Sequence, residues 1–404
     1  MKGMMINFIY LLKKQMNKNS IIIISLFVIL ISCKKKDVTT VSSTGTSTAA
    51  GGFGYDNISN PFFSADFGSC MDNEHLPGRQ LSYLSTNHLI VSSVNYDTAY
   101  FDKMQISKIG VLGNFIWQKT LSSGEKHYSG QAFETSTGDI IAIGGVSKPL
   151  SSWTDSKVFI AKLNPATGDT VWTRKYGYSY IDHGIVGYEA LDHNYWIVDF
   201  YHQNGRATLL KIAPNGDSLT SVFNTGGDHY STALVTANKK IVMVGQAGSI
   251  TAYICKYTDG IKDFENSFSI TGYTTAIVNN VCETTDGGFV IVGNCYNPAM
   301  YAPRYGFLIK VDVNGNKLWE RVLTQFDGSE ITACVEAGPD KFILAIGRYG
   351  SGNGQLLKYN LSDLVPLVNA GYQFYSDSQL LLNSNSLYRV MLYGNVRVKL
   401  HTVY

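Results

Sequence analysis

Charged residues and proline are scarce in this chain of 404 residues. Only 16% of its residues are charged, whereas soluble domains usually have about 25%, and it contains nine prolines. It is rich instead in aromatic residues, with 26 Tyr and 19 Phe, and 45% of it is hydrophobic. Aromatic side chains suit the half-buried surface of a sheet, so this composition favours β-structure and excludes a collagen, a coiled coil or a wholly disordered chain.

A cluster of basic residues, which nucleic-acid binding usually needs, is also missing. The formal charge is +2, but four lysines, at positions 2, 13, 14 and 18, lie in an N-terminal segment that we expect to be removed. The remaining chain has 29 basic and 31 acidic residues, and the basic ones are mostly dispersed singly. We therefore expect no nucleic-acid partner.

The N-terminus carries the features of an export signal. Residues 21–32 (IIIISLFVILIS) form an apolar run behind lysines with no acidic residue, and this run is shorter than the roughly 20 residues of a spanning helix. We predict a signal peptide over residues 1–32. The run ends in LISC, which resembles the lipobox of bacterial lipoproteins and implies lipid attachment at Cys33. The alternative is an uncleaved anchor with an incidental cysteine, and translation starts at either Met1 or Met16.

Residues 33–58 are rich in Ser, Thr, Gly and Ala. Such a composition cannot bury enough apolar surface to fold, so it predicts a flexible tether. Its first residues, SCKKKD, resemble the mature N-termini of Bacteroidetes lipoproteins. The surface-export signals of that group tend to place acidic residues after the cysteine, and the three lysines here depart from that pattern. The resemblance implies an outer-membrane lipoprotein, and both the periplasmic side and the cell surface stay open.

One apolar strand recurs seven times over residues 59–404, at intervals of 45 to 56 residues. Its copies are LIVSS (89–93), IIAIG (140–144), WIVDF (196–200), IVMVG (241–245), FVIVG (289–293), ILAIG (343–347) and VMLYG (390–394). A second strand follows each copy and has a lysine at its fourth position; these lysines are Lys108, Lys162, Lys211, Lys256, Lys310, Lys358 and Lys399. Most units then continue with a Gly/Asn/Asp turn and a third strand that often begins with tryptophan.

Four short strands per repeat of about 50 residues is the period of a β-propeller blade. We therefore predict an all-β fold, a seven-bladed β-propeller with four antiparallel strands per blade. The lysines are expected to pack their stems between blades, because their strand lies third from the axis. The last unit ends without its outermost strand, and the stretch 60–67 precedes the first unit without a partner. An N-terminal strand is therefore expected to close the ring.

The inferred strand order, from an innermost strand a through b and c to an outermost d, resembles that of kelch-type propellers. The segments DGGFVIVGN and FLIKVDVNGNKLWERVL are similar to repeats of secreted and lipid-anchored Bacteroidetes propeller proteins. The segment KLNPATGDTVW (162–172) is similar to the repeats of quinoprotein-like propellers, including outer-membrane assembly lipoproteins. Only this unit shows that pattern, so we expect no cofactor.

Cysteine and histidine spacing gives no support for a metal site. Cys282 and Cys334 are predicted to occupy equivalent positions on neighbouring innermost strands, as buried thiols rather than a bridge. No cysteine lies at ligand spacing from a histidine, and the turn 312–316 lacks the glutamate that a calcium loop requires. The sequence also has no HExxH, GxSxG or P-loop motif. We predict no metal ion and name no catalytic residue.

Two sets of residues are candidates for ligand binding. Polar residues precede the innermost strands at a nearly constant offset from strand b: His75, His127, His183, His229, Glu330 and Asp377. Loops expected on the same face vary in length and carry aromatic residues, among them Trp153, Tyr296 and Tyr301. We predict that the polar set surrounds one mouth of the central channel. The alternative is that these residues only bond the neighbouring blade.

These patterns predict a membrane-tethered envelope lipoprotein whose propeller binds a glycan, a peptide or a protein partner. One alternative is an enzyme, a hydrolase or lyase for glycans or peptides at the channel mouth, which clustered carboxylates would favour. The other is a structural component of an outer-membrane assembly, which an apolar side patch would favour.

Overall fold

Every regular element that the computed structural model describes is a β-strand. It describes residues 63–69, 80–95, 103–148, 156–177, 182–201, 206–224, 226–227, 229–248, 250–298, 303–325, 328–348, 354–360, 363–366, 377–383, 386–393 and 395–402. All of these belong to one compact unit, Phe53–Tyr404. Within these ranges no helix has the length and apolar character to cross a membrane. The predicted signal peptide and the tether, with Cys33, lie outside the described residues.

The strands fall into seven groups of four. Blade 1 contains β2 (Leu81–Leu84), β3 (His88–Asn95), β4 (Lys103–Gly110) and β5 (Phe115–Leu121). Blade 2 contains β6 (Lys126–Glu134), β7 (Ile140–Ser147), β8 (Lys157–Leu163) and β9 (Thr170–Tyr176). Blade 3 contains β10 (Asp182–Glu189), β11 (Tyr195–Tyr201), β12 (Arg206–Ile212) and β13 (Ser218–Asn224). Blade 4 contains β14 (His229–Val235), β15 (Ile241–Ala247), β16 (Thr251–Thr258) and β17 (Ile261–Phe268).

The remaining blades follow the same plan. Blade 5 contains β18 (Thr275–Glu283), β19 (Phe289–Tyr296), β20 (Tyr305–Val311) and β21 (Lys317–Val322). Blade 6 contains β22 (Ser329–Gly338), β23 (Lys341–Arg348), β24 (Gly354–Asn360) and β25 (Asp363–Pro366). Blade 7 contains β26 (Asp377–Asn383), β27 (Ser386–Tyr393), β28 (Asn395–Thr402) and, as its fourth strand, β1 (Phe63–Ser69).

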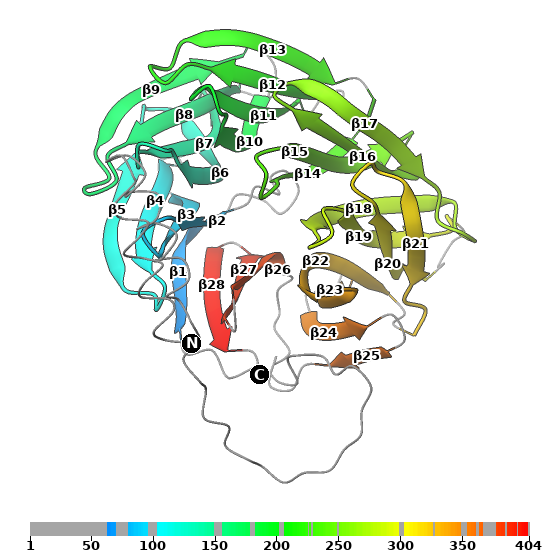
Figure 1. Cartoon of the computed structure of the whole chain (residues 1–404). Helices are drawn as coiled ribbons and strands as arrows, with labels where there is room; N and C mark the ends of the chain where they lie inside the picture. The colour runs from blue at the N-terminus through cyan, green and yellow to red at the C-terminus, as the bar shows by residue number, and fades with distance from the viewer. Residues whose placement is uncertain are drawn as a thin grey trace, which may run out of the picture. The chain divides into compact units, whose positions relative to one another are not determined.

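The strands of each blade pair antiparallel in the order a, b, c, d, as predicted. Blades 2 to 6 are separate four-stranded sheets, whereas blades 1 and 7 are joined into one eight-stranded sheet by the pairing of Ser69 in β1 with Val94 in β3. The innermost strands contact one another in sequence, from β6 through β10, β14, β18 and β22 to β26, which arranges the blades around a common axis (Figure 1). The predicted all-β, four-stranded, propeller-type architecture is thereby confirmed.

The burial of each strand follows its place in the blade. The b strands are rich in Ile and Val and are buried along their whole length in β7 and nearly so in β3 and β19. The d strands, such as β9 and β13, are mostly exposed. A b strand packs against the next blade with one face and the preceding blade with the other, whereas a d strand is the outer edge of its sheet. This difference explains why the b strands gave the clearest repeat in the sequence.

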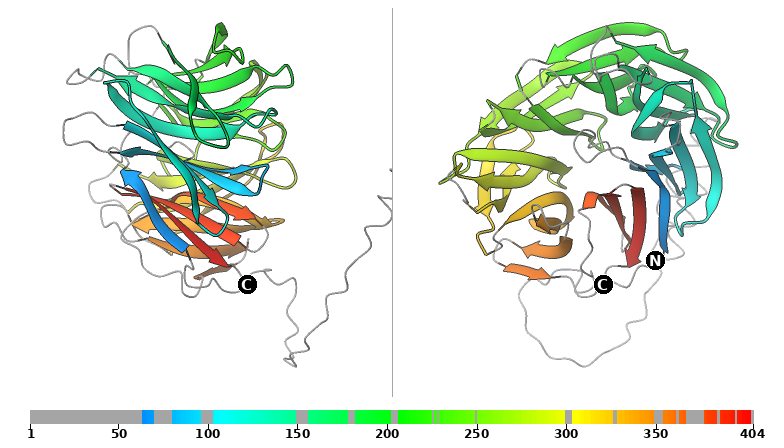
Figure 2. Two further views of the ribbon diagram at one scale, coloured as in Figure 1. Left: turned by 90° about the vertical axis from the view of Figure 1, so that its left-hand side faces the viewer. Right: turned by 180° about the vertical axis from the view of Figure 1, so that it is seen from behind.

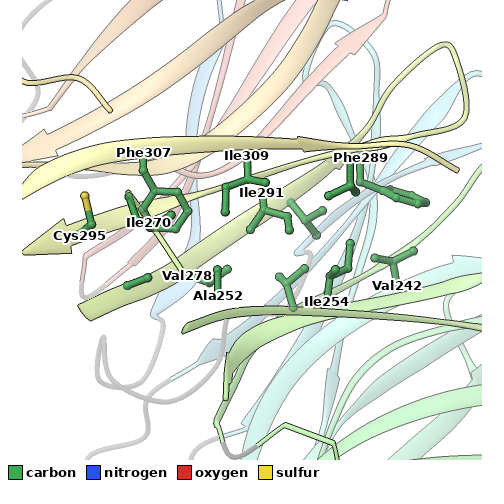
Figure 3. Close-up of a cluster of buried hydrophobic side chains, with 14 of the residues drawn as sticks. Val242, Ala252, Ile254, Ile270, Val278, Phe289, Ile291, Cys295, Phe307 and Ile309 are labelled. Carbon is green, nitrogen blue, oxygen red and sulfur yellow. The ribbon is translucent and has the colours of Figure 1, made fainter. Parts of the chain in front are cut away.

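The core consists of layers between adjacent blades. In the layer between blades 4 and 5, Val242, Ala252 and Ile254 of blade 4 face Phe289 and Phe307 of blade 5 (Figure 3). All five are at most 1% exposed. Burying one such side chain contributes about 1.5–3 kcal/mol, so each interface between blades holds a substantial part of the folding free energy.

The N-terminal strand closes the ring, as predicted. β1 pairs antiparallel with β28, with Phe63 opposite Leu400, and the two strands lie side by side in both views of Figure 2. A second contact, near the axis, joins blade 7 to blade 1. The side chain of Gln379 in β26 accepts from the backbone N–H of Leu81 in β2 at 3.1 Å and donates to its carbonyl at 2.9 Å. The ring is therefore closed at both its outer and its inner edge.

Strand pairing corrects the sequence alignment of three repeats. The residue that begins strand b after the a–b turn is Ile140 in blade 2, Tyr195 in blade 3 and Phe342 in blade 6. WIVDF and ILAIG were therefore aligned one residue too far along. VMLYG was aligned two residues too far along, because Arg389 and not Met391 lies opposite the strand-c Lys399. Because side chains alternate between the two faces of a strand, the shift by one residue exchanges the faces of WIVDF and ILAIG, whereas the shift by two residues keeps the faces of VMLYG.

Candidate binding face

The propeller has two faces that differ in their connections. We call the side with the a–b and c–d turns the turn face, and the side with the b–c and d–a connections the loop face. The turns are short and regular; in the a–b turn of blade 5, for example, Gly287 has a φ of 78° and donates to the carbonyl of Thr284. The loop face carries the longer and more variable connections.

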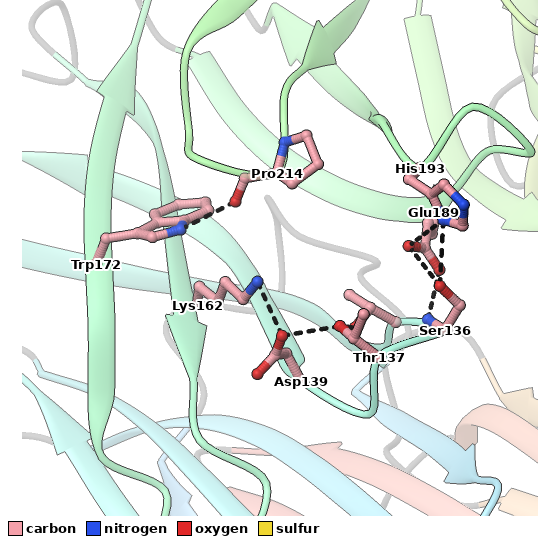
Figure 4. Close-up of polar contacts among 9 residues, drawn as sticks. Ser136, Thr137, Asp139, Lys162, Trp172, Glu189, His193 and Pro214 are labelled. Atoms are coloured by element: carbon pink, nitrogen blue, oxygen red, sulfur yellow. Dashed lines mark hydrogen bonds and ion pairs between the residues drawn. The ribbon is translucent and has the colours of Figure 1, made fainter.

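The strand-c lysines hold the turn face together. Lys108 Nζ donates to the carbonyl of Pro165 in the next blade at 3.0 Å, and Lys256 Nζ donates in the same way to Val313 at 2.7 Å. Other lysines pair with a carboxylate in the a–b turn of their own blade: Lys162 with Asp139 at 2.8 Å (Figure 4), Lys211 with Asp192 at 2.6 Å and Lys310 with Asp286 at 2.7 Å. These contacts confirm the scaffold role for these five of the seven lysines.

A second series of contacts on the turn face was not predicted. A glutamate at the end of strand a accepts a hydrogen bond from a backbone N–H in the a–b turn of the preceding blade, as Glu189 does from Ser136 (Figure 4). The four pairs are Glu134 with Ser85, Glu189 with Ser136, Glu283 with Ala237 and Glu336 with Thr285, at 2.5–2.7 Å. The sequence signal is a glutamate immediately before the turn, and it repeats in four units.

The predicted polar residues begin innermost strands rather than lying in loops. His183, His229 and Glu330 share one register position, opposite Phe200, Gln246 and Gly347 respectively. Asp377 begins β26, opposite Met391. His127 stands one residue further toward the loop face, opposite Val146. His75, Trp153 and Tyr301 lie outside the described residues.

His127 is buried and does not contribute to an exposed floor. The one-residue offset turns its ring to the side of blade 2 that faces blade 1. There it packs edge-on against Phe159 of β8 in the same blade, with ring centroids 4.8 Å apart. Burial lowers the pKa of His127 to about 4 against the opposing charge of Glu125, so the ring is neutral at pH 7. Its Nε2 lies 3.0 Å from Ser123 Oγ, and its Nδ1 has no hydrogen-bond partner among the described residues.

This Ser123–His127 contact resembles part of a nucleophile and base pair. In a working triad a third group holds the other ring nitrogen and stabilises the imidazolium. Here Glu125 accepts from Ser123 at 2.8 Å instead. The described residues therefore supply two members of a triad without the group that orients the base.

Two other predicted residues are brought together by an arginine. Tyr296 ends β19, and the guanidinium of Arg304 lies 4.5 Å from the centre of its ring. Arg304 also lies near enough to Glu330 to oppose the rise that burial causes in the pKa of that carboxyl group. His229 is exposed at the start of β14. The loop face therefore links Tyr296 and Glu330 at the boundary of blades 5 and 6, without gathering the whole predicted set.

A hollow of about 530 Å³ lies on the loop face of blade 5. Three segments line it: the d–a connection before β18, the b–c connection before β20, and the end of β21. The lining residues are Thr271, Gly272, Tyr273, Asn297, Pro303, Tyr305, Val322 and Thr324. No lining residue carries a formal charge. The volume falls in the range of about 300–1,000 Å³ typical of small-molecule sites.

The walls of the hollow are braced by hydrogen bonds. Asn297 accepts from the N–H of Thr274 at 2.9 Å and donates to the carbonyl of Gly272 at 3.2 Å, which ties the two connections to each other. The rings of Tyr273 and Tyr305 meet edge to face, with centroids 5.9 Å apart. The hollow is therefore preformed. The aromatic b–c loop was predicted from sequence, but the contribution of Tyr273 was not.

Other features of the described residues do not mark a site. No group of three or more His, Cys, Asp or Glu residues in these ranges could hold a metal ion. Most exposed large apolar residues lie on five outermost strands, and four others lie in turns or connections. The residues on the strands are Phe115, Ile116, Val171, Leu219, Phe223, Ile261 and Leu318, and the four others are Leu112, Leu191, Ile250 and Val313. Their recurrence blade after blade is a property of the repeat.

Comparison with known proteins establishes the fold. No family model and no curated protein matches the chain. A streptogramin B lyase structure is 11% identical, with 87% of this chain and 99% of that chain covered and a TM-score of 0.51. The propeller domain of Cps50 (Swd1) from Myceliophteria thermophila is 8% identical, with coverages of 86% and 99% and a TM-score of 0.53.

A third solved structure, BBS1N in complex with ARL6DN, is 10% identical, with 87% of this chain and 98% of that chain covered and a TM-score of 0.52. At such identities the likeness concerns the fold alone. Strand order, ring closure and these neighbours agree that the chain is a β-propeller.

Proposed function

We propose that this protein is a lipid-anchored envelope protein whose propeller is a binding module, with the hollow of blade 5 as its ligand site. The observation that carries the proposal is the preformed, uncharged hollow lined by the contacting tyrosines Tyr273 and Tyr305 on the face with the variable loops. Binding sites concentrate on loops that a rigid scaffold positions. The propeller of BBS1 was solved with a bound protein, so this fold is able to serve as a binding module.

The chemistry of the lining favours a neutral sugar residue as the ligand. A pyranose presents an apolar C–H face and a rim of hydroxyl groups, and tyrosine combines an apolar ring with a polar tip. Hydroxyl groups of Thr271 and Thr324 and the amide of Asn297 lie around the tyrosines. With no charged residue in the lining, an anionic or cationic ligand would lose its hydration without gaining a partner.

Binding of neutral oligosaccharides to the full chain tests this proposal. Tyr305→Ala should weaken binding about tenfold or more, because a buried aromatic anchor typically contributes more than 1 kcal/mol. Leu191→Ala is the matched control, since Leu191 is an exposed apolar residue on the turn face (95% exposed) and should leave affinity unchanged. Equal binding by both variants and the parent would reject the hollow. If Tyr305→Ala weakened the binding of a peptide or a protein and not of a sugar, the hollow would remain the binding site but its ligand would be that peptide or protein.

An enzyme is the second candidate, and the contact between Ser123 and His127 is the observation in its favour. A nucleophilic serine should react with a fluorophosphonate probe, and Ser123→Ala should abolish that labelling. An unlabelled parent protein would leave the pair with a structural role only.

A further inference from the structure

Two buried thiols meet between blades 5 and 6. Cys282 in β18 and Cys334 in β22 place their Sγ atoms 3.0 Å apart, although they are 52 positions apart in the sequence. Both side chains lie in the hydrophobic layer between the blades and are only 7% and 5% exposed. The two sulfur atoms are not joined by a bond in the structure.

Strand register explains why these two side chains face each other. Cys282 pairs with Val290, the second residue of strand b when counted from Phe289 in blade 5. Cys334 pairs with Leu344, the third residue when counted from the equivalent Phe342 in blade 6. The two positions are therefore not equivalent, contrary to the sequence prediction. The offset of one residue turns Cys282 toward blade 6 and Cys334 back toward blade 5, because successive side chains point to opposite faces.

The same register at other blade interfaces carries a different kind of pair. At three of them, these two register positions hold a larger residue in one blade and a smaller one in the next: Phe133 and Gly187, Tyr188 and Ala233, and Leu234 and Val281. At the boundary of blades 5 and 6 both positions are cysteine. The fold itself does not require sulfur here, so the pairing of two thiols is specific to this interface.

We propose that Cys282 and Cys334 form a disulfide that joins blades 5 and 6. The sulfur atoms need to approach by about 1 Å to reach the bond length of roughly 2.05 Å. The proposal rests on the proposed function in one respect: an envelope location supplies an oxidising compartment, in which disulfides persist. The geometry of the thiols does not depend on that location.

The reaction is thiol–disulfide exchange with a disulfide donor, either an oxidised oxidoreductase or a small disulfide such as oxidised glutathione. One cysteine thiolate attacks a sulfur of the donor, which releases the first donor thiol and leaves a mixed disulfide. The second cysteine thiolate then attacks the protein-bound sulfur and releases the second donor thiol. Two electrons pass from the cysteine pair to the donor, and the two protons end on the released thiols.

The two other described cysteines lack such a partner. Cys255 accepts a hydrogen bond from Asn224 Nδ2 at 3.1 Å, and the thiol of Cys295 donates to the carbonyl of Tyr305 at 3.5 Å. Burial raises the pKa of both thiols to about 12, so their reactive thiolate forms are rare. They are built-in controls, because both should remain reduced under the same conditions.

Peptide mapping of the full chain tests the proposal directly. Purified protein is oxidised with glutathione disulfide, remaining thiols are alkylated under denaturing conditions, and the digest is analysed by mass spectrometry. We expect one linked peptide pair containing Cys282 and Cys334, with Cys255 and Cys295 fully alkylated. Reduction should lower the melting temperature by about 5 °C, and the Cys282→Ser and Cys334→Ser variants should lose that shift.

Complete alkylation of Cys282 and Cys334 after oxidation, or a link from either of them to Cys70, would overturn the proposal. The mapping uses the unmodified protein, so it remains decisive even where a serine variant folds poorly. A disulfide found in protein that binds no sugar would leave this inference standing while the proposed function fails. The two results are therefore distinguishable.

Discussion

At the scale of single residues, the position of a side chain within one strand period decides its role. His127 and His229 both begin innermost strands, yet His127 is fully buried and His229 is exposed. A register difference of one residue separates them. The sequence prediction used the number of residues between each histidine and its strand b. Bulges in strand a change the register without a visible signal in that number, so the prediction could not distinguish the buried His127 from the exposed His229.

Burial of His127 makes stability depend on pH in a defined direction. Its pKa in the folded protein is about 4, below the ordinary value of 6.5, because burial disfavours the charged ring. As the pH falls below about 6.5, the unfolded chain binds a proton that the folded protein binds only near pH 4. The folded state should therefore lose up to about 3 kcal/mol of stability between those values.

His127→Gln should remove this part of the pH dependence. Urea unfolding of the parent and of the variant at pH 7 and at pH 4.5 measures it as the difference between the two proteins. His193→Gln is the control, because the His193 side chain is 70% exposed on the turn face. Parallel loss of stability in the parent and in His127→Gln would show that the buried ring is not responsible.

At the scale of elements, the role of the closing strand β1 can be tested by deletion. Deletion of residues 59–69 removes β1 and leaves the edge of β28 unpaired, which should cost several kcal/mol and favour aggregation. Deletion of residues 38–52 removes only predicted tether and should leave the melting temperature unchanged. Thermal unfolding and light scattering compare the two. Identical melting of both truncations and the parent would contradict the role of β1.

The inner contact of the same closure can be tested separately. Gln379→Leu removes both hydrogen bonds between its amide and the backbone of Leu81, and we expect a loss of about 1–3 kcal/mol in the free energy of unfolding. Gln118→Leu is the matched control, because that amide is exposed and bonds Ser107 within one blade. An equal effect of both substitutions would mean that the inner contact adds nothing to ring closure.

Sequence reasoning succeeded for the elements and partly failed for the site, for physical reasons. Buried b strands such as 241–245 and 289–293 repeat because two neighbouring blades constrain them, so the pattern is visible without a structure. The hollow combines Tyr273, Tyr305 and Val322 from three segments, and the contact between Tyr273 and Tyr305 depends on how two connections fold over one blade. No periodicity encodes such a contact. The glutamate series was visible but was not recognised as a link between blades.

At the scale of the whole molecule, the anchor is the main prediction. If Cys33 carries the lipid, Cys33→Ala should move the protein from the membrane fraction to the soluble fraction, since acyl chains would be its attachment. Fractionation followed by a high-salt wash measures this. Cys70→Ala is a control for loss of a cysteine elsewhere in the chain. Retention of Cys33→Ala in the washed membranes would contradict lipid anchoring.

The direction of β1 has a consequence for how an anchored propeller would present its ligand site. Phe63 lies opposite Leu400, near the end of β28 where that strand reaches the turn face, so the chain enters the ring on the turn face. Thirty positions separate Cys33 from Phe63, a distance of at most about 100 Å when extended. The predicted tether therefore joins the ring on the face opposite the hollow of blade 5, so a ligand that approaches the loop face does not meet the strand by which the chain enters the ring.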